Sequence, residues 1–276
     1  MKFVDAHIHL ADEGYAHNVE KVVEEAKQAN VLGLVANATD LKTSNKTLEL
    51  ATKYPDHVYA ALGIHPWNTK KLQPNETQDT IDLIYENAQN PNMVAVGEIG
   101  LDSTYSGTGE PTEIQKQVFH EMLLAAEKTG LPAVIHSRGA TSQIVDMLPS
   151  YKISKVLLHW FSQPHSLIPT IIDRSYYITE GPTALYAKGI REVIRQIPLT
   201  NLMTETDGPV RFRGPFKDKF TTPCFVLSIV EAIAEIKEKE KSEVADQIFK
   251  NFVNFFGVEG VRDKRHDEGT VGSIKK

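Results

Sequence analysis

Short apolar runs recur along the chain, and each is followed by a segment whose apolar residues are spaced for one face of a helix. The segment 111–130 is the clearest of these predicted helices, because Glu113 lies in its first turn and Gly130 closes it. Other helices are predicted at 19–30, 43–54 and 77–89. The apolar runs predict eight strands, at 3–10, 32–39, 58–66, 93–102, 132–138, 155–161, 175–182 and 201–209.

The predicted strands are nearly continuous apolar runs, which is typical of parallel strands that are buried on both faces. Eight strand–helix units in about 250 residues predict an α/β fold, a TIM (β/α)8 barrel, formed as a single domain over residues 1–260. A doubly wound open sheet is the alternative, but no GxGxxG or GxxxxGK[ST] motif follows an early strand. We expect the helical segment 231–257 to cover the barrel exterior and residues 261–276 to form a polar, flexible tail.

The first predicted strand, FVDAHIHL, places three polar side chains at alternating positions. Because successive side chains of a strand point to opposite faces, Asp5, His7 and His9 share one face. On a helix, two histidines that are two residues apart would diverge instead of converging on one point. The strand therefore offers two imidazoles near its carboxyl end, which is where TIM barrels keep their catalytic groups.

Side chains of the metal-ligating types also end several other predicted strands. A lone histidine at a strand end is more often structural, but six such residues at the ends of five strands make coincidence a poor explanation. Four imidazoles and two carboxylates would be costly to desolvate together, and a metal supplies the compensating charge. A single catalytic zinc usually takes three protein ligands, so the set indicates two ions, and Glu98 has two oxygens with which to bridge them. The predicted ligands are His7, His9, Glu98, His136, His159 and Asp207.

The composition is that of an ordinary globular protein, with 41% hydrophobic and 24% charged residues. A formal net charge of −6 argues against a uniformly basic nucleic-acid surface but allows a local basic patch. Cys224 is the only cysteine, so no intrachain disulfide can form, and we expect a reducing compartment. There is neither a signal-peptide pattern nor an apolar run long enough for a membrane helix, so we expect a cytoplasmic protein without a membrane partner.

Five motifs in combination resemble those of the TatD family of metal-dependent hydrolases, within the amidohydrolase superfamily. They are the HxH of residues 7–9, GEIGLD at 97–102, IHSR at 135–138, HWF at 159–161 and TETD at 204–207. The resemblance extends from Phe3 to Phe256 and implies a TIM barrel, two divalent metal ions per chain and deoxyribonuclease activity in the cytoplasm.

The resemblance also assigns roles to the polar residues. It places His7, His9, Glu98 and Asp207 on one ion, and Glu98, His136 and His159 on the other, with Glu98 as the bridge. We expect Asp207 to be the general base that takes a proton from the activated water, with metal ligation alone as the alternative. Asp5 and Glu205 are expected behind the ligands, Asp5 orienting a histidine through its free ring nitrogen. Zinc, manganese, cobalt or nickel suits these ligands, and magnesium suits them less well because of the imidazoles.

Several residues near the predicted site could bind a phosphodiester, which needs positive charge and hydrogen-bond donors. Arg138 shares a face with His136 and lies nearer the mouth, and His65 could either donate to a phosphate or brace a ligand. In the loop RFRGPFKDK, residues 211–219, Arg211 and Arg213 could contact phosphates or form salt bridges within the loop. Trp67 and Trp160 could stack on a base or serve ordinary packing.

Three positions depart from the pattern expected of the family. Trp160 follows His159 where a small residue is more common, and Gly208 stands where Ala is common. Glu180 ends the seventh predicted strand and is expected near the mouth, where its charge would oppose a polyanion. These departures leave the metal ligands intact but leave the substrate open.

Three functions follow from these features. The first is a DNA phosphodiesterase that trims single-stranded ends, because a deep barrel mouth admits an end more easily than a duplex interior. The second is a metal hydrolase of a carboxylic ester, lactone or amide, including a small molecule or a misacylated tRNA, which the net charge and Glu180 favour. The third is a non-catalytic binding protein, against which the intact ligand set argues. The sequence predicts no oligomeric state.

Overall fold

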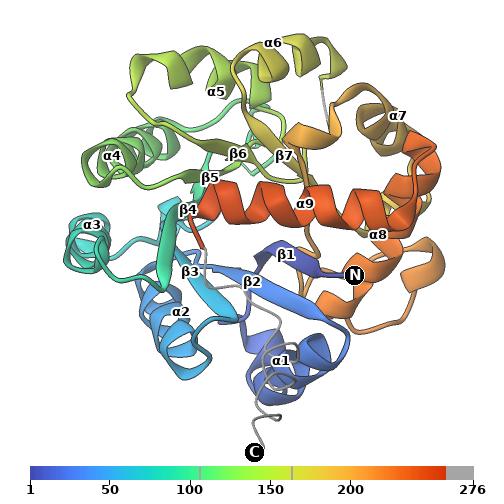
Figure 1. Cartoon of the computed structure of the whole chain (residues 1–276). Coiled ribbons are helices and arrows are strands. Elements are labelled where there is room, and N and C mark those ends of the chain that lie inside the picture. Colours follow the sequence, from blue (N-terminus) through green and yellow to red (C-terminus); the bar gives the residue numbers. More distant parts are fainter. Residues whose placement is uncertain (106, 163, 259–276) are drawn as a thin grey trace, which may run out of the picture.

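Eight parallel strands follow one another in chain order and form a nearly closed barrel with helices around it (Figure 1). The structure is a computed structural model that describes residues 1–105, 107–162 and 164–258. The strands are β1 (Phe3–Ile8), β2 (Val31–Asn37), β3 (Val58–Leu62), β4 (Met93–Gly100), β5 (Ala133–His136), β6 (Val156–Leu158), β7 (Tyr177–Glu180) and β8 (Leu202–Thr204). The helices are α1 (Val19–Gln28), α2 (Leu41–Lys53), α3 (Glu76–Asn87), α4 (Glu113–Thr129), α5 (Thr141–Met147), α6 (Ile168–Asp173), α7 (Lys188–Gln196), α8 (Val226–Lys237) and α9 (Lys241–Phe256). The predicted single-domain TIM barrel is confirmed.

Local signals in the sequence set the limits of the outer helices. Asp40 caps α2 in a reciprocal capping box with Thr43, which satisfies backbone donors at the start of that helix. Thr112 caps α4, and Gly130 ends it with a φ of +73°, in the left-handed region that glycine adopts without strain. The predicted stop of this helix at Gly130 is therefore confirmed.

All eight strands end two to five residues earlier than predicted, and for β6 and β8 the reason is the conformation of residues just beyond the strand. β6 ends at Leu158 and β8 ends at Thr204. Trp160 has a φ of +42° and Asp207 a φ of +49°, both in the left-handed region, which is incompatible with an extended strand. His159 and Asp207 consequently lie on the loops at the carboxyl ends of the strands.

The seam between β8 and β1 is closed by single hydrogen bonds. The hydroxyl of Thr204 donates to the carbonyl of Val4 at 2.8 Å, and the backbone N–H of Asp207 donates to the carbonyl of His7 at 2.9 Å. These bonds hold the end of the last strand against the end of the first. They bring Asp207 beside His7, although 200 residues separate them in the sequence.

Helix α9 crosses the amino-terminal end of the barrel (Figure 1). The side-chain amide of Asn251 donates to the carbonyls of Leu199 and Leu202. The ring of Phe252 packs so closely on Gly33 of β2 that a Cβ atom at residue 33 would be 2.8 Å from the ring. The predicted segment 231–257 thus divides into α8 and α9, because Glu238 has a φ of +52°. The expectation that the whole segment covers the barrel exterior is wrong for α9, which closes the end opposite the carboxyl ends of the strands.

Within the described residues, no helix has both the length and the apolar content needed to cross a membrane. The predicted tail, residues 261–276, lies outside the part of the chain that the structure describes.

Candidate metal centre

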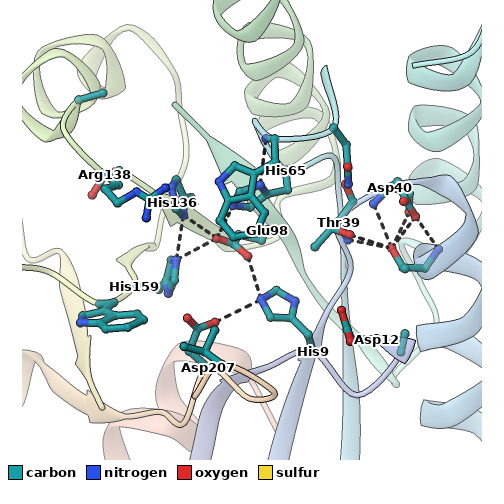
Figure 2. Close-up of a pocket in the computed structure, with 18 of the residues that line it drawn as sticks. His9, Asp12, Thr39, Asp40, His65, Glu98, His136, Arg138, His159 and Asp207 are labelled. Atoms are coloured by element: carbon teal, nitrogen blue, oxygen red, sulfur yellow. Dashed lines mark hydrogen bonds and ion pairs between the residues drawn. The ribbon is translucent and has the colours of Figure 1, made fainter. Parts of the chain in front are cut away.

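The predicted ligands converge in one cavity of about 1650 Å³ at the carboxyl ends of the strands (Figure 2). His7 and Glu98 project from β1 and β4, and His136 is the last residue of β5. His9, His159 and Asp207 lie on the loops just beyond β1, β6 and β8. His65 enters from the loop after β3. Seven polar side chains from six strands thus face one point, as barrel topology allows.

Glu98 lies at the centre of this cluster and each of its oxygens faces a different group of imidazoles. Its Oε1 is 2.9 Å from Nδ1 of His136 and 2.8 Å from Nε2 of His159. Its Oε2 is 3.3 Å from Nε2 of His7 and 3.2 Å from Nε2 of His9. Two oxygens of one carboxylate therefore face two separate sets of nitrogen ligands, which is the arrangement a bridging ligand requires.

Asp207 completes the first of these sets. Its Oδ1 is 3.2 Å from Nε2 of His9 and 3.5 Å from Nε2 of His7. Ligand atoms of His7, His9 and Glu98 lie within 4.8 Å of one another, and so do those of His7, His159 and Asp207. Nitrogen and oxygen atoms at this spacing fit a divalent ion of the first transition series.

In two imidazoles, the ring nitrogen that points away from Glu98 donates a hydrogen bond to an acceptor. The ring nitrogen that faces Glu98 is then free to bind a metal. Nδ1 of His9 is 2.9 Å from the carbonyl of Asn37, so it carries a proton and leaves the Nε2 lone pair facing Glu98. Nε2 of His136 is 2.8 Å from Oδ2 of Asp102, which leaves its Nδ1 facing Glu98. These second contacts fix both tautomers as a metal ligand needs them.

His65 differs from His9 and His136 in that its protonated nitrogen faces Glu98. Its Nδ1 accepts a hydrogen bond from the backbone N–H of Trp67 at 3.0 Å, so the proton lies on Nε2, which is 3.2 Å from Oε1 of Glu98. Although ligand atoms of His65, Glu98 and His136 are close enough to hold an ion, a protonated Nε2 cannot be a ligand. His65 therefore braces Glu98 in this arrangement, one of the two roles its position predicted.

The surrounding imidazoles favour an ionised Glu98. Burial by itself would raise the pKa of Glu98, but its contacts with His65, His159, His7 and His136 outweigh burial and hold this pKa well below its usual range. Burial lowers the pKa of His65 to about 4, so its imidazole is neutral near pH 7.

His9 and His7 differ in protonation when no ion is bound. Burial lowers the pKa of His7, and the nearby His159 lowers it further. For His9, hydrogen bonds with Asp207 and Glu98 outweigh burial and raise the pKa to about 10. A metal would replace the extra proton of His9, so metal binding at this cluster releases protons.

Asp102 is a residue of the site that the sequence analysis did not identify. Its buried carboxylate accepts hydrogen bonds at Oδ2 from His136, from Nε of Arg138 at 3.0 Å and from the indole N–H of Trp67 at 3.2 Å. Burial alone would raise the pKa of Asp102, but the hydrogen bonds from His136 and Thr104 lower it. Its place in GEIGLD, four residues after Glu98, was the available signal, because an acid directly after a buried strand is uncommon.

Gly100 explains how β4 and β5 bring Glu98 and His136 together. It has a φ of +149°, and a Cβ at this position would be 1.9 Å from the carbonyl oxygen of His136. A side chain at residue 100 would push the two strands apart. The Gly in GEIGLD is thus required by the close approach of the two backbones.

Glu205 lies behind His159, as its position predicted. Its Oε2 is 3.4 Å from Nδ1 of His159, which is too long for a well-formed hydrogen bond. The hydroxyl of Thr179 donates to the same oxygen at 2.5 Å and accepts from the backbone N–H of Trp160 at 3.1 Å. This chain of contacts fixes the backbone of Trp160, directly after His159.

Asp5 does not contact an imidazole nitrogen among the described residues, so its predicted orienting bond is wrong. Its carboxylate accepts from the backbone N–H groups of His7 at 3.3 Å and Thr206 at 3.0 Å, and from the hydroxyl of Thr206. Asp5 therefore ties β1 to the segment after β8. It positions the backbone of His7 and of Thr206, the residue before Asp207.

Glu180 is also not where the sequence predicted. It ends β7, but its side chain is fully buried and does not line the cavity. Neither of its oxygens has a hydrogen-bond partner among the described residues. Burial raises the pKa of Glu180 well above its usual range, and the charge of Glu205 raises it further, so the site favours the uncharged carboxyl. The expected repulsion of a polyanion by Glu180 is therefore absent.

The residues predicted to bind substrate fall into two groups. Arg138 and His65 line the cavity next to the cluster (Figure 2). Arg211 and Arg213 have exposed side chains beyond Val210, which lines the cavity, while Phe212 between them is buried against Trp160. The basic loop thus follows the rim and not the cavity itself.

The chain is similar to a known protein family and to several known proteins over most of its length. Residues 4–257 match the family described as TatD related DNase. An uncharacterized metal-dependent hydrolase of Bacillus subtilis, YabD, is 32% identical and covers 92% of this chain and 98% of its own. The human deoxyribonuclease TATDN3 is 31% identical, with coverage of 92% and 94%. The 3'-5' ssDNA/RNA exonuclease TatD of Erwinia tasmaniensis is 28% identical, with coverage of 92% and 99%.

A solved structure shares the fold. The crystal structure of YJJV, a TatD homolog from Escherichia coli, superposes with a TM-score of 0.82 at 26% identity. The match covers 92% of this chain and 98% of the other.

Proposed function

We propose that this chain, which belongs to the family of TatD-related DNases, cleaves phosphodiester bonds at single-stranded DNA ends with two divalent ions. The observation that carries the proposal is the position of Glu98, whose two oxygens face two separate sets of imidazoles. His7, His9 and Asp207 would hold one ion with Oε2 of Glu98. His136 and His159 would hold the other with Oε1. Zinc, manganese or magnesium remains the candidate ion, and the imidazoles favour the first two.

Two bound ions would lower the pKa of a shared water and stabilise the charge that develops on the phosphate. Asp207 is ionised, because hydrogen bonds and charges from His9, His7 and His159 outweigh burial and lower its pKa. As the water oxygen bonds to phosphorus and the phosphorus–oxygen bond of the leaving group breaks, Asp207 accepts the water proton and passes it to the leaving oxygen. Glu98 would fix the position of the two sets of imidazoles relative to each other, because one of its oxygens faces each set.

Arg138 binds the phosphate in this proposal. Its Nε is held by Asp102, and about half of its side chain is exposed to the cavity. A fixed guanidinium beside the centre would bind a phosphate oxygen through its outer nitrogens. His65, held between Trp67 and Glu98, keeps the central carboxylate in place.

Single-stranded ends fit better than duplex because the ligands lie inside a cavity, with all the ligand residues but His9 only 0–8% exposed. The alternative reaction, on a carboxylic ester or amide, was favoured in the sequence by the net charge of −6 and by Glu180. The second of these arguments is lost, because Glu180 is buried and burial favours its uncharged form.

The test is hydrolysis of an end-labelled single-stranded oligonucleotide by protein that has been treated with a chelator and then resupplied with Mg²⁺, Mn²⁺ or Zn²⁺. A duplex of the same sequence and a panel of lactones and amides are assayed in parallel. We expect metal-dependent shortening of the single strand from an end. The Asp207→Asn variant should keep its fold and lose at least about 100-fold in kcat, as expected for a general base.

Turnover of a lactone or amide without any DNA cleavage would assign the centre to the alternative reaction. Unchanged kcat in Asp207→Asn would remove Asp207 from the mechanism.

A further inference from the structure

Two large aromatic side chains stand exposed beside the candidate metal centre and have no part in the mechanism above. Trp67 is 44% exposed and Tyr105 is 43% exposed. Their ring centroids are 4.7 Å apart, and the rings are tilted by 36°. Adjacent exposed aromatic side chains at the mouth of a cavity indicate a contact surface, whereas scattered ones need no explanation. Packing alone does not account for them.

The ring of Trp67 is held in place by the groups of the metal centre. Its indole N–H donates to Asp102 at 3.2 Å, and its ring meets that of His65 edge to face, with centroids 4.5 Å apart. The ring centroid of His136 is 6.4 Å away. Trp67 is therefore both exposed and fixed. A ligand that stacks on its ring causes little loss of side-chain conformational entropy.

Arg138 adds positive charge to the same surface. Its guanidinium carbon lies 5.0 Å from the ring centroid of Tyr105 and 5.9 Å from that of Trp67. Asp102 holds both Arg138 and Trp67, and also His136 of the centre. One buried carboxylate thus fixes the distance between a phosphate-binding group, an aromatic surface and a metal ligand.

We propose that Trp67 and Tyr105, with Arg138 beside them, form a stacking surface for the nucleobase of the nucleotide whose phosphodiester bond is cleaved. The proposal rests on the proposed function for the position of the phosphate. Every base has an aromatic face, so stacking would bind any of the four without reading the sequence. An aromatic surface with an adjacent arginine is the combination that single-stranded nucleic acids require.

The experiment compares two single-stranded oligonucleotides that differ only in the terminal nucleotides, which carry either thymine or a tetrahydrofuran abasic analogue. Binding is measured by fluorescence anisotropy in the presence of a chelator, so that it depends on neither metal nor turnover. Cleavage is measured separately with metal. The variants are Trp67→Ala, Trp67→Phe and Tyr105→Ala. Leu124→Ala on the outer helix α4 is the control, because Leu124 is 43% exposed and outside the cavity.

We expect the wild-type protein to bind the abasic strand about 5- to 140-fold more weakly, the range that stacking of 1–3 kcal/mol per base gives at 1.4 kcal/mol per tenfold. Trp67→Ala should bind both strands equally and weakly, whereas Trp67→Phe should keep most of the preference. Tyr105→Ala should lose part of it, and Leu124→Ala none.

Equal binding of the two strands by the wild-type protein would overturn the stacking surface, and so would an unchanged preference in Trp67→Ala. Cleavage without base preference would leave the proposed function in place and reject only the stacking surface. Base-dependent binding through Trp67 without cleavage would support the stacking surface and reject the proposed hydrolysis.

Discussion

At the scale of single residues, two buried carboxylates, Glu98 and Asp102, have different roles in the site. Glu98 joins two sets of imidazoles, and Asp102 holds His136, Arg138 and Trp67 from behind. The role of Glu98 as a ligand was predictable, because a carboxylate in an otherwise apolar, buried strand requires a compensating charge. The roles of Asp102 and the Asn37 carbonyl were not, because they depend on contacts between side chains of different strands that no local pattern encodes.

Replacing Asp102 tests its positioning role. Asp102→Asn keeps the shape but removes the charge that fixes Nε2–H of His136, so we expect metal affinity and kcat to fall about 10- to 100-fold. Metal affinity is measured by competition with a chromogenic chelator. Thr104→Val is the control, because the hydroxyl of Thr104 donates to Oδ1 of Asp102 and not to Oδ2, the oxygen that holds His136, Arg138 and Trp67. If both variants bind metal as tightly as the wild type, Asp102 does not position the ligand.

Glu180 provides a prediction about pH. Burial raises its pKa in the folded protein, so the folded state keeps a proton that the unfolded state loses above its ordinary pKa of about 4.3. The stabilising contribution of this proton is complete at low pH and is lost as pH rises toward the raised pKa. Glu180→Gln cannot ionise, so its Tm should fall less than that of the wild type between pH 5 and pH 8.

This comparison is made with a chelator present, so that metal binding adds no pH dependence of its own. Parallel Tm curves for the two proteins would show that Glu180 is ionised or solvated in the folded state.

At the scale of elements, the eight strands were predictable but their ends were not. Short apolar runs located each strand, because parallel strands buried on both faces are nearly continuous in apolar residues. The early ends of β6 and β8 depend on the left-handed residues Trp160 and Asp207, which sequence patterns seldom reveal. Glu180 was wrongly expected at the mouth, because the position of a residue at the end of a strand does not show whether its side chain faces the cavity or is buried in the protein.

The contribution of α9 to stability, at the amino-terminal end of the barrel, can be tested by replacing Phe252. Phe252 in α9 is fully buried and packs against Gly33 and Phe256. Phe252→Ala should lower the free energy of unfolding by about 3–5 kcal/mol, measured by urea denaturation. Leu124→Ala should change it by no more than about 0.5 kcal/mol.

The kcat of folded Phe252→Ala should equal that of the wild type, because α9 lies opposite the metal centre. A loss below about 1 kcal/mol would mean that α9 is not part of the core.

At the scale of the whole molecule, an acidic protein carries a basic loop at the rim of its cavity. The buried Phe212 directs Arg211 and Arg213 to the exterior, and the cavity lining ends at Val210. The sequence predicted this charge beside the site, because a loop after the last strand of a barrel must lie at its mouth. It did not predict that the loop stays on the rim.

The salt dependence of DNA binding tests this loop. Arg211→Ala combined with Arg213→Ala should weaken single-strand binding and make its salt slope shallower by up to about 1.4, at about 0.7 per phosphate contact. Lys239→Ala combined with Lys241→Ala removes the same charge at the junction of α8 and α9 and should leave the slope unchanged. Identical slopes in the wild type and the arginine variant would remove the loop from the nucleic-acid interface.

The most direct test of the metal centre is anomalous diffraction from crystals of the protein grown with Mn²⁺ or Zn²⁺. We expect two peaks about 3.5–4 Å apart, one on each side of the Glu98 carboxylate. One should be ligated by His7, His9 and Asp207, and the other by His136 and His159, with His65 bound to neither. A single peak, or none touching Glu98, would contradict a bridged two-ion centre.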